Sequence, residues 1–279
     1  DWDITTSAKP LQVKELFART LDTGLQHGTV TVLLDKDSYE VTTYRIDGEY
    51  LDGRHPRQVE FTSRLEEDLQ RRDFTINAMA YSRETGLVDC FQGMKDMQLH
   101  RVRCVGEPRE RFSEDALRIL RAVRFAAQLG FGIEERTREA IRQLAPTLEK
   151  ISAERIRVEL NKLLISPRPQ LLREAWELGI TAVVLPEFDR AMDTPQNVPE
   201  HFCTVGEHTL RALELVEAAP VLRWTMLLHD LAKPQVRTTG LGGIDYFPHH
   251  QEKGEQLAVE VLRRLRFDNE TVRRVRLLV

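Results

Sequence analysis

Two carboxylates at the start of the chain have a spacing that can serve metal chemistry. The sequence opens as DWDITTSA, in which Asp1 and Asp3 precede a β-branched run. Side chains alternate between the two faces of a β-strand, so we expect both acids on one face and Trp2 on the other. Carboxylate oxygens are ligands that Mg²⁺ prefers in proteins. Asp1 and Asp3 are therefore candidate magnesium ligands.

A third acid, in a later β-rich stretch, can complete this cluster. GTVTVLLDKDSYEVTTYRID contains two β-rich runs separated by residues 35–38, which is typical of a hairpin, and Glu40 lies in the second run. With Asp1 and Asp3 it predicts a catalytic site for two Mg²⁺ ions. One ion would activate an attacking hydroxyl and the other would hold a triphosphate leaving group. The alternative is that the paired acids cap a helix or line a turn.

The stretch RRDFTINA carries side chains suited to the phosphates and the sugar of a nucleotide. Arg71 and Arg72 can bind phosphate oxygens through charge-assisted hydrogen bonds. The stretch is helical in pattern, so we expect Asp73 and Asn77 one turn apart, where they can position sugar hydroxyls. The alternative, in which Asp73 caps a helix, is compatible with a sugar contact.

A pair of residues in EDALR can choose a base. Asp115 and Arg118 are three apart in a helical pattern, which predicts one shared face. Cytosine and adenine each present an amino donor beside a ring-nitrogen acceptor, whereas guanine and uracil reverse both groups. An acid and an arginine can therefore select C and A without a template. The alternative is a surface salt bridge. Arg121 and Arg124 continue the row at spacings of three and are candidate contacts for a phosphate or an RNA end.

Histidines in the last third predict a second metal site. His208 lies in GEHTL, the adjacent His229 and Asp230 lie in LLHDLAKP, and His250 lies in FPHHQEKGE. These residue types suit a divalent transition metal, and we expect the four side chains to converge from separate helical segments. The pattern resembles the metal site of HD domains, which implies either a metal phosphohydrolase or a helical body that is retained for structure.

Composition limits the class of protein. The chain has 279 residues, 41% of them hydrophobic, and no apolar run approaches membrane-spanning length, so we expect no membrane partner. Three cysteines without metal-type spacing indicate a reducing compartment, the cytoplasm. The net charge of −4 does not indicate a nucleic-acid binder, but arginines are concentrated between residues 101 and 124. The oligomeric state stays open.

Five separated motifs together resemble one family. DWDITTSA, GLQHGTVTV, YEVTTYRIDGEYLDGRHP, EEDLQRRDFTINAMAY and EDALRILRAVRFAAQLGF resemble, in order and spacing, the bacterial class II tRNA nucleotidyltransferase and poly(A) polymerase family. The resemblance runs from Asp1 to about Leu164 and is greatest to the CCA-adding branch. It implies addition of C and A to tRNA 3′ ends, from CTP and ATP, by a two-metal mechanism. In that family a glycine-rich segment precedes the acidic strand, so we expect the natural chain to begin before Asp1 and to continue beyond Val279.

The resemblance also implies roles for particular side chains. Arg72 and Asp73 would contact phosphate and sugar. Asp115 and Arg118 would select the base. The complete DGEYLDGRHP loop argues against an enzyme that adds C alone.

We expect an α/β nucleotidyltransferase domain of the polymerase β palm type, followed by an all-α neck and body with an HD-like region. The expected domains are 1–105 for the palm, 106–165 for the neck that recognises the base, and 166–279 for the body. Three alternatives remain. The first is an A-adding enzyme or a poly(A) polymerase. The second is an HD-type phosphohydrolase with an RNA-binding front domain. The third is a non-catalytic RNA-binding module, which would give no reason for acids and base-reading residues to occur together.

Overall fold

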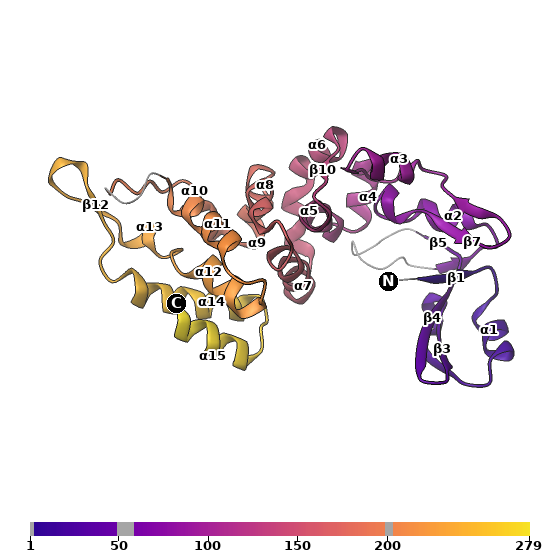
Figure 1. Ribbon diagram of the computed structural model, residues 1–279. Coiled ribbons are helices and arrows are strands. Elements are labelled where there is room, and N and C mark those ends of the chain that lie inside the picture. Colours follow the sequence, from indigo (N-terminus) through magenta and orange to yellow (C-terminus); the bar gives the residue numbers. More distant parts are fainter. Residues whose placement is uncertain (1–2, 49–58, 199–202) are drawn as a thin grey trace. The chain divides into compact units, whose positions relative to one another are not determined.

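The chain divides into two compact units in the computed structural model, which describes residues 3–48, 59–198 and 203–279 (Figure 1). Unit 1 comprises Asp1–Leu99 and Arg103–Asp115, and it contains the sheet strands β1 to β4. Unit 2 comprises His100–Val102 and Ala116–Val279 and is almost entirely helical. The expected order of a mixed α/β front part and a helical remainder is confirmed.

Unit 1 is built on a four-stranded mixed sheet of order β1-β4-β3-β2. Its strands are β1 (Ile4–Thr6), β2 (Thr20–Gly24), β3 (Thr29–Leu34) and β4 (Asp37–Thr43). Strands β3 and β4 form the predicted hairpin, and β1 runs parallel to β4 with Ile4 opposite Val41. Helix α1 (Pro10–Leu16) begins with proline, whose fixed φ suits a first helical turn. Its Val13 packs with Val30, Val32 and Val41 in a buried cluster, so one sheet face is covered.

The rest of unit 1 consists of short elements. They are the 3₁₀ turn η1 (Leu25–His27), strands β5 (Arg45–Asp47) and β6 (Val59–Phe61), helix α2 (Leu65–Gln70), the 3₁₀ turn η2 (Thr75–Asn77), strands β7 (Ala80–Ser82) and β8 (Gly86–Val88), and helices α3 (Gly93–Gln98) and α4 (Pro108–Glu114). Strands β5 and β6 pair antiparallel, as do β7 and β8.

The prediction that RRDFTINA is helical is wrong. Helix α2 ends at Gln70, before this stretch begins. The fully buried Phe74 instead forms an antiparallel bridge with Cys104. The amide of Thr75 donates to the carbonyl of Arg103, and that of Val105 donates to the carbonyl of Asp73. Backbone pairing with a segment remote in sequence therefore overrides the local helical pattern.

Unit 2 is a helical assembly. Its helices are α5 (Leu117–Leu129), α6 (Glu135–Leu144), α7 (Ala153–Leu164), α8 (Leu172–Glu177), α9 (Thr181–Val184), α10 (Pro186–Met192), α11 (Val205–Leu215), α12 (Pro220–Leu228), α13 (Lys233–Val236), α14 (His250–Arg264) and α15 (Asn269–Leu278). Two short sheets join them, β9 (Arg101–Val102) with β10 (Gly132–Ile133) and β11 (Thr238–Thr239) with β12 (Asp245–Tyr246). The 3₁₀ turns are η3 (Ala145–Lys150), η4 (Pro169–Leu171) and η5 (Leu241–Gly243). Within the described ranges, no helix is both long and apolar enough to cross a lipid bilayer.

A buried acid joins two of these helices. Helix α5 ends, as its sequence predicts, at Gly130, whose φ of 71° is the left-handed conformation that glycine tolerates. Glu159 of α7 is buried and accepts a hydrogen bond of 2.9 Å from Nε of Arg124 on α5. Nη1 of Arg121 lies 3.9 Å from the other oxygen of the same carboxylate. Glu159 therefore holds α7 against α5 through charge as well as through packing.

Replacing Glu159 should destabilise unit 2. Glu159→Ala leaves the buried guanidinium of Arg124 without its acid, which should lower the free energy of unfolding by about 3–5 kcal/mol. Glu154→Ala is the matched control, because Glu154 lies on the same helix but is exposed. Urea unfolding of both variants measures the difference. Equal stability of the two variants would contradict a stabilising role for the buried pair.

Candidate functional site

The parallel pairing of β1 with β4 brings two of the three predicted catalytic acids together. Ile4 lies opposite Val41, so the register continued by one residue places Asp3 beside Glu40. Val41 is buried, whereas Glu40 is exposed on the other face of the sheet. The carboxylate of Asp3 is 89% exposed, and Asp1 lies outside the described residues. Two open carboxylates on neighbouring strands fit a hydrated hard cation such as Mg²⁺.

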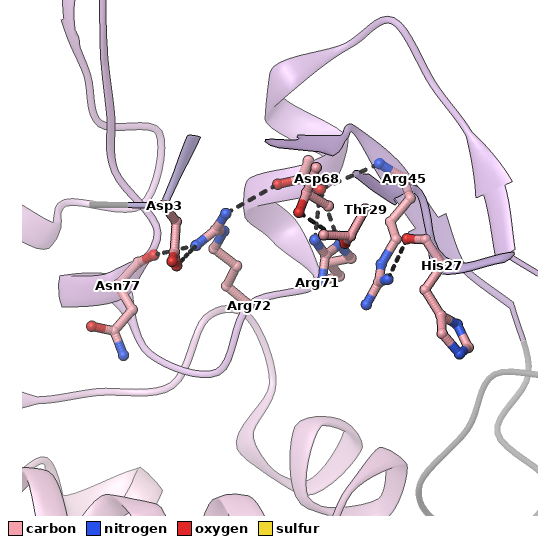
Figure 2. Close-up of polar contacts among 9 residues, drawn as sticks. Asp3, His27, Thr29, Arg45, Asp68, Arg71, Arg72 and Asn77 are labelled. Carbon is pink, nitrogen blue, oxygen red and sulfur yellow. Dashed lines mark hydrogen bonds and ion pairs between the residues drawn. The ribbon is translucent and has the colours of Figure 1, made fainter. Parts of the chain in front are cut away.

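Arg72 lies next to these acids, between Asp3 and Asp68 (Figure 2). Its Nη1 is 4.0 Å from Oδ2 of Asp3 and donates to the carbonyl oxygen of Asn77 at 3.5 Å. Its Nη2 donates to Oδ2 of Asp68 at 3.4 Å. A cationic fork is therefore held at the edge of the acidic cluster, where it can meet a phosphate.

Sequence reasoning missed Asp68, which organises the arginines of this site. Its Oδ1 accepts hydrogen bonds from Nε and Nη2 of Arg71, at 3.1 and 2.7 Å, and from the backbone amide of Arg45 at 3.2 Å. Arg71, predicted to bind nucleotide, is thus engaged with a buried acid. The signal was present in EEDLQRR, where an acid precedes two arginines by three and four residues.

The predicted sugar-binding pair does come together, but not through a helix. Nδ2 of Asn77 donates to Oδ1 of Asp73 at 3.1 Å, and the amide of Phe74 donates to the same oxygen at 2.8 Å. Asp73 belongs to the extended segment that pairs with residues 103–105, and Asn77 ends the 3₁₀ turn η2. A turn therefore produces the contact that the sequence pattern assigned to an α-helix.

The prediction that Asp115 and Arg118 share one helical face is wrong. Asp115 follows α4 with an extended backbone, φ −145° and ψ 103°, and α5 begins at Leu117. Two helices meet within EDALR, so the spacing of three residues spans a break rather than a turn of helix. Asp115 closes unit 1, whereas Arg118 lies in the first turn of α5 in unit 2 and is buried. Their joint role in base choice stays a prediction.

The remaining arginines of the predicted row differ in their surroundings. The side chain of Arg124 is 8% exposed, pairs with Glu159 and stacks on the ring of Phe125, with its guanidinium carbon 3.5 Å from the ring centroid. The side chain of Arg121 is 31% exposed. Arg121 is therefore better placed than Arg124 to meet a ligand.

In unit 2, the predicted convergence of three histidines on Asp230 is confirmed. Oδ2 of Asp230 lies 3.6 Å from Nε2 of His208 and 3.2 Å from Nε2 of His229. Its Oδ1 lies 3.8 Å from Nε2 of His250. Ligand atoms of His208, His229 and Asp230 all lie within 4.8 Å of one another, a spacing that fits one metal ion.

Hydrogen bonds to the backbone orient two of the histidine rings of this cluster. Nδ1 of His229 bonds to the carbonyl of Met226 at 2.7 Å, and Nδ1 of His250 bonds to that of Phe247 at 2.9 Å. A carbonyl can only accept, so each Nδ1 carries a hydrogen, and Nε2 is the ring nitrogen that faces Asp230.

A lysine shares the acid of this cluster. Nζ of Lys233 lies 2.8 Å from Oδ2 of Asp230 and donates to Oε1 of Gln196 at 2.9 Å. Burial favours the neutral forms of His229 and Asp230, but the hydrogen bond between them outweighs burial. The pKa of His229 is therefore raised and the pKa of Asp230 is lowered. Asp230 is thus ionised and already faces one positive charge.

Two family models match the chain. The model described as "Poly A polymerase head domain" matches residues 1–103, and the model described as "Probable RNA and SrmB- binding site of polymerase A" matches residues 130–192. The first match contains the acidic strand and the RRDFTINA stretch. The second ends before the histidine cluster.

Curated relatives and a solved structure that resemble this chain are all CCA-adding enzymes. The chain is 48% identical over 220 residues to the CCA-adding enzyme of Lactobacillus helveticus, covering 77% of this chain and 54% of the relative. It is 54% identical over 165 residues to the CCA-adding enzyme of Leuconostoc citreum, and this match covers 59% of this chain and 41% of the relative. The chain thus spans about half the length of these curated relatives. The crystal structure of the Bacillus stearothermophilus CCA-adding enzyme in complex with CTP superposes with a TM-score of 0.67 at 32% identity, covering 98% of this chain and 68% of that one. The chain therefore belongs to the class II CCA-adding enzyme family.

Proposed function

We propose that this chain is the nucleotidyltransferase part of an enzyme that adds C and A to tRNA 3′ ends, from CTP and ATP and without a template. The observation that carries the proposal is the placement of Asp3 beside Glu40, with Arg72 4.0 Å from Asp3. The relatives named as CCA-adding enzymes favour this over a poly(A) polymerase or an A-adding enzyme. A tRNA substrate in a bacterium implies a cytoplasmic location.

In this proposal residues 1–105 form the palm, 106–165 form the neck and 166–279 form the helical body. The acids Asp1, Asp3 and Glu40 would hold Mg²⁺. When bound, Mg²⁺ supplies activation of the RNA 3′ hydroxyl and neutralisation of the triphosphate. The high exposure of Asp3 suits this role, because a hard cation that keeps some of its water can reach the carboxylate.

The side chains around the acids would bind and orient the nucleotide. Arg72 would donate to the phosphates from the edge of the acidic cluster. Asp73 and Asn77, already hydrogen-bonded to each other, would position the sugar hydroxyls. Asp115 would accept from the base amino group and Arg118 would donate to the ring nitrogen.

We also propose that the histidine cluster of unit 2 is an HD-type site for a divalent transition metal. The orientation of His229 and His250 favours this, since their Nδ1 atoms are held by backbone carbonyls and their Nε2 atoms face Asp230. The charge of Lys233 beside Asp230 opposes it, because a second cation there is repelled. The alternative is that Lys233 stabilises a structural cluster that binds no metal.

Asp3→Asn should abolish addition while leaving the fold intact. The exposed carboxylate contributes little to stability, but its charge is required to hold the cation, so turnover should fall by at least about a hundredfold. Asp37→Asn, at an exposed acid of the same sheet, is the control and should keep full activity. Extension of tRNA that lacks its 3′ end measures both. Near-normal turnover of Asp3→Asn would remove Asp3 from the catalytic site.

Asp115→Ala and Arg118→Ala should each relax base choice. A wrong base leaves polar groups unpaired at about 1–3 kcal/mol each, so the unaltered protein should disfavour GTP and UTP by roughly a hundredfold or more. The measurement is incorporation of each of the four nucleotides separately. The control is Glu110→Ala, at an exposed residue of α4. Selectivity that survives in both test variants would reject the base-reading role.

Substitution of two adjacent histidines, His249 and His250, tests whether the histidine cluster of unit 2 binds metal. Co²⁺ added to the protein should produce a visible absorption band, and His250→Ala should weaken Co²⁺ binding by at least about tenfold, whereas His249→Ala should not. His249 is the matched control because its side chain is 76% exposed and contacts Glu252. A protein that binds no Co²⁺ would favour the structural cluster.

A further inference from the structure

We infer that Asp68 is a positioning residue, which holds the guanidinium of Arg72 in the orientation that binds the triphosphate. The inference rests on the proposed function. Asp68 lies in the last turn of α2 and is 1% exposed, so it cannot touch a substrate directly. Any effect of Asp68 on nucleotide binding must therefore pass through the groups that contact it.

The two oxygens of Asp68 have separate partners. Oδ1 accepts from the guanidinium of Arg71 and from the backbone amide of Arg45, which begins strand β5. Oδ2 accepts from Nη2 of Arg72. The guanidinium of Arg45 in turn donates to the carbonyl of His27 at 2.7 Å, so the network reaches the turn before β3 (Figure 2). Asp68 is thus fixed by its surroundings before it acts on Arg72.

Arg71 already neutralises the buried carboxylate of Asp68, so the charge of Arg72 is available for an anion. A buried carboxylate requires a compensating cation, and Arg71 supplies it through two hydrogen bonds. Arg72 adds a second positive charge to the same acid. Asp68, Arg71 and Arg72 together carry one net positive charge, and the carboxylate of Asp3, 4.0 Å from Arg72, offsets it as long as no cation engages Asp3. A triphosphate beside the acidic cluster is the ligand that this excess charge fits.

The geometry of Arg72 shows what Asp68 prevents. The guanidinium is held on one side by Asp68, while Nη1 points toward Asp3 and the carbonyl of Asn77. Its buried Nε has no hydrogen-bond partner among the residues that the structure describes. Without Asp68, the guanidinium would turn toward the carboxylate of Asp3 and pair with an acid that the cation needs. Asp68 therefore limits how closely the phosphate-binding arginine can approach the metal-binding acid, whose Oδ2 lies 4.0 Å from Nη1 of Arg72.

The test is calorimetric titration of the protein with CTP, with Mg²⁺ present and tRNA absent, so that no addition occurs. Asp68→Asn should raise the dissociation constant for CTP about tenfold, as expected for loss of a charge-assisted hydrogen bond that orients the ligand group. Glu67→Gln is the matched control. It removes one charge from the same helix at a side chain that contacts Thr62 and Arg64, and it should change CTP binding less than about twofold.

A double-mutant cycle separates positioning from general destabilisation. Arg72→Gln should itself weaken CTP binding, and Asp68→Asn added to that variant should weaken it no further, because Asp68 acts through Arg72. If Asp68→Asn alone fails to fold, Arg72→Gln still tests the pair, because it leaves Asp68 with Arg71, and unchanged CTP binding by that variant would also overturn the inference. A full additional loss in the Arg72→Gln background, or unchanged CTP binding by a folded Asp68→Asn variant, would overturn the inference. Failure of the unaltered protein to bind CTP would overturn the proposed function together with it.

Discussion

The parallel pairing of β1 with β4 is the constraint on which the candidate site depends. Asp3 and Glu40 are far apart in sequence, and this register alone makes them neighbours. Burial fixes which face of β4 carries Glu40, because Val41 must face the apolar cluster formed with Val13 of α1 and with β3. A slip of β4 by one residue against β3 would turn Val41 outward and Glu40 into that cluster. Hydrophobic packing on one face of the sheet therefore determines where the carboxylates lie on the other.

Each unit uses a buried acid to hold two arginines. Asp68 contacts Arg71 and Arg72 in unit 1, and Glu159 contacts Arg121 and Arg124 in unit 2. In both cases one arginine is the closer partner and satisfies the acid, while the other keeps a longer contact. A buried acid satisfied in this way can orient a second arginine without neutralising it. Arginines prepared for an anionic ligand in this way have already lost much of their rotamer freedom before the ligand arrives.

Sequence reasoning succeeded where local pattern and tertiary structure agree. The β3–β4 hairpin, the end of α5 at Gly130 and the convergence on Asp230 were all predictable from turn residues, glycine and residue type. Sequence reasoning failed where the local conformation depends on backbone segments that are remote in sequence. RRDFTINA forms no α-helix because Phe74 pairs with Cys104, and EDALR contains a helix break at Asp115. Asp68 was missed because an acid near arginines on a helix is usually an exposed pair, and its burial depends on β5 and on Arg45.

The exposed acids of the sheet and the arginine beside them are proposed to form one nucleotide-adding site. The most direct measurement is incubation of the protein with tRNA that lacks its 3′ end, with CTP alone, ATP alone or both. We expect extension by C with CTP alone and completion of the CCA end when both are present, with GTP and UTP inactive. Extension by A alone, or no extension under any of these conditions, would contradict it.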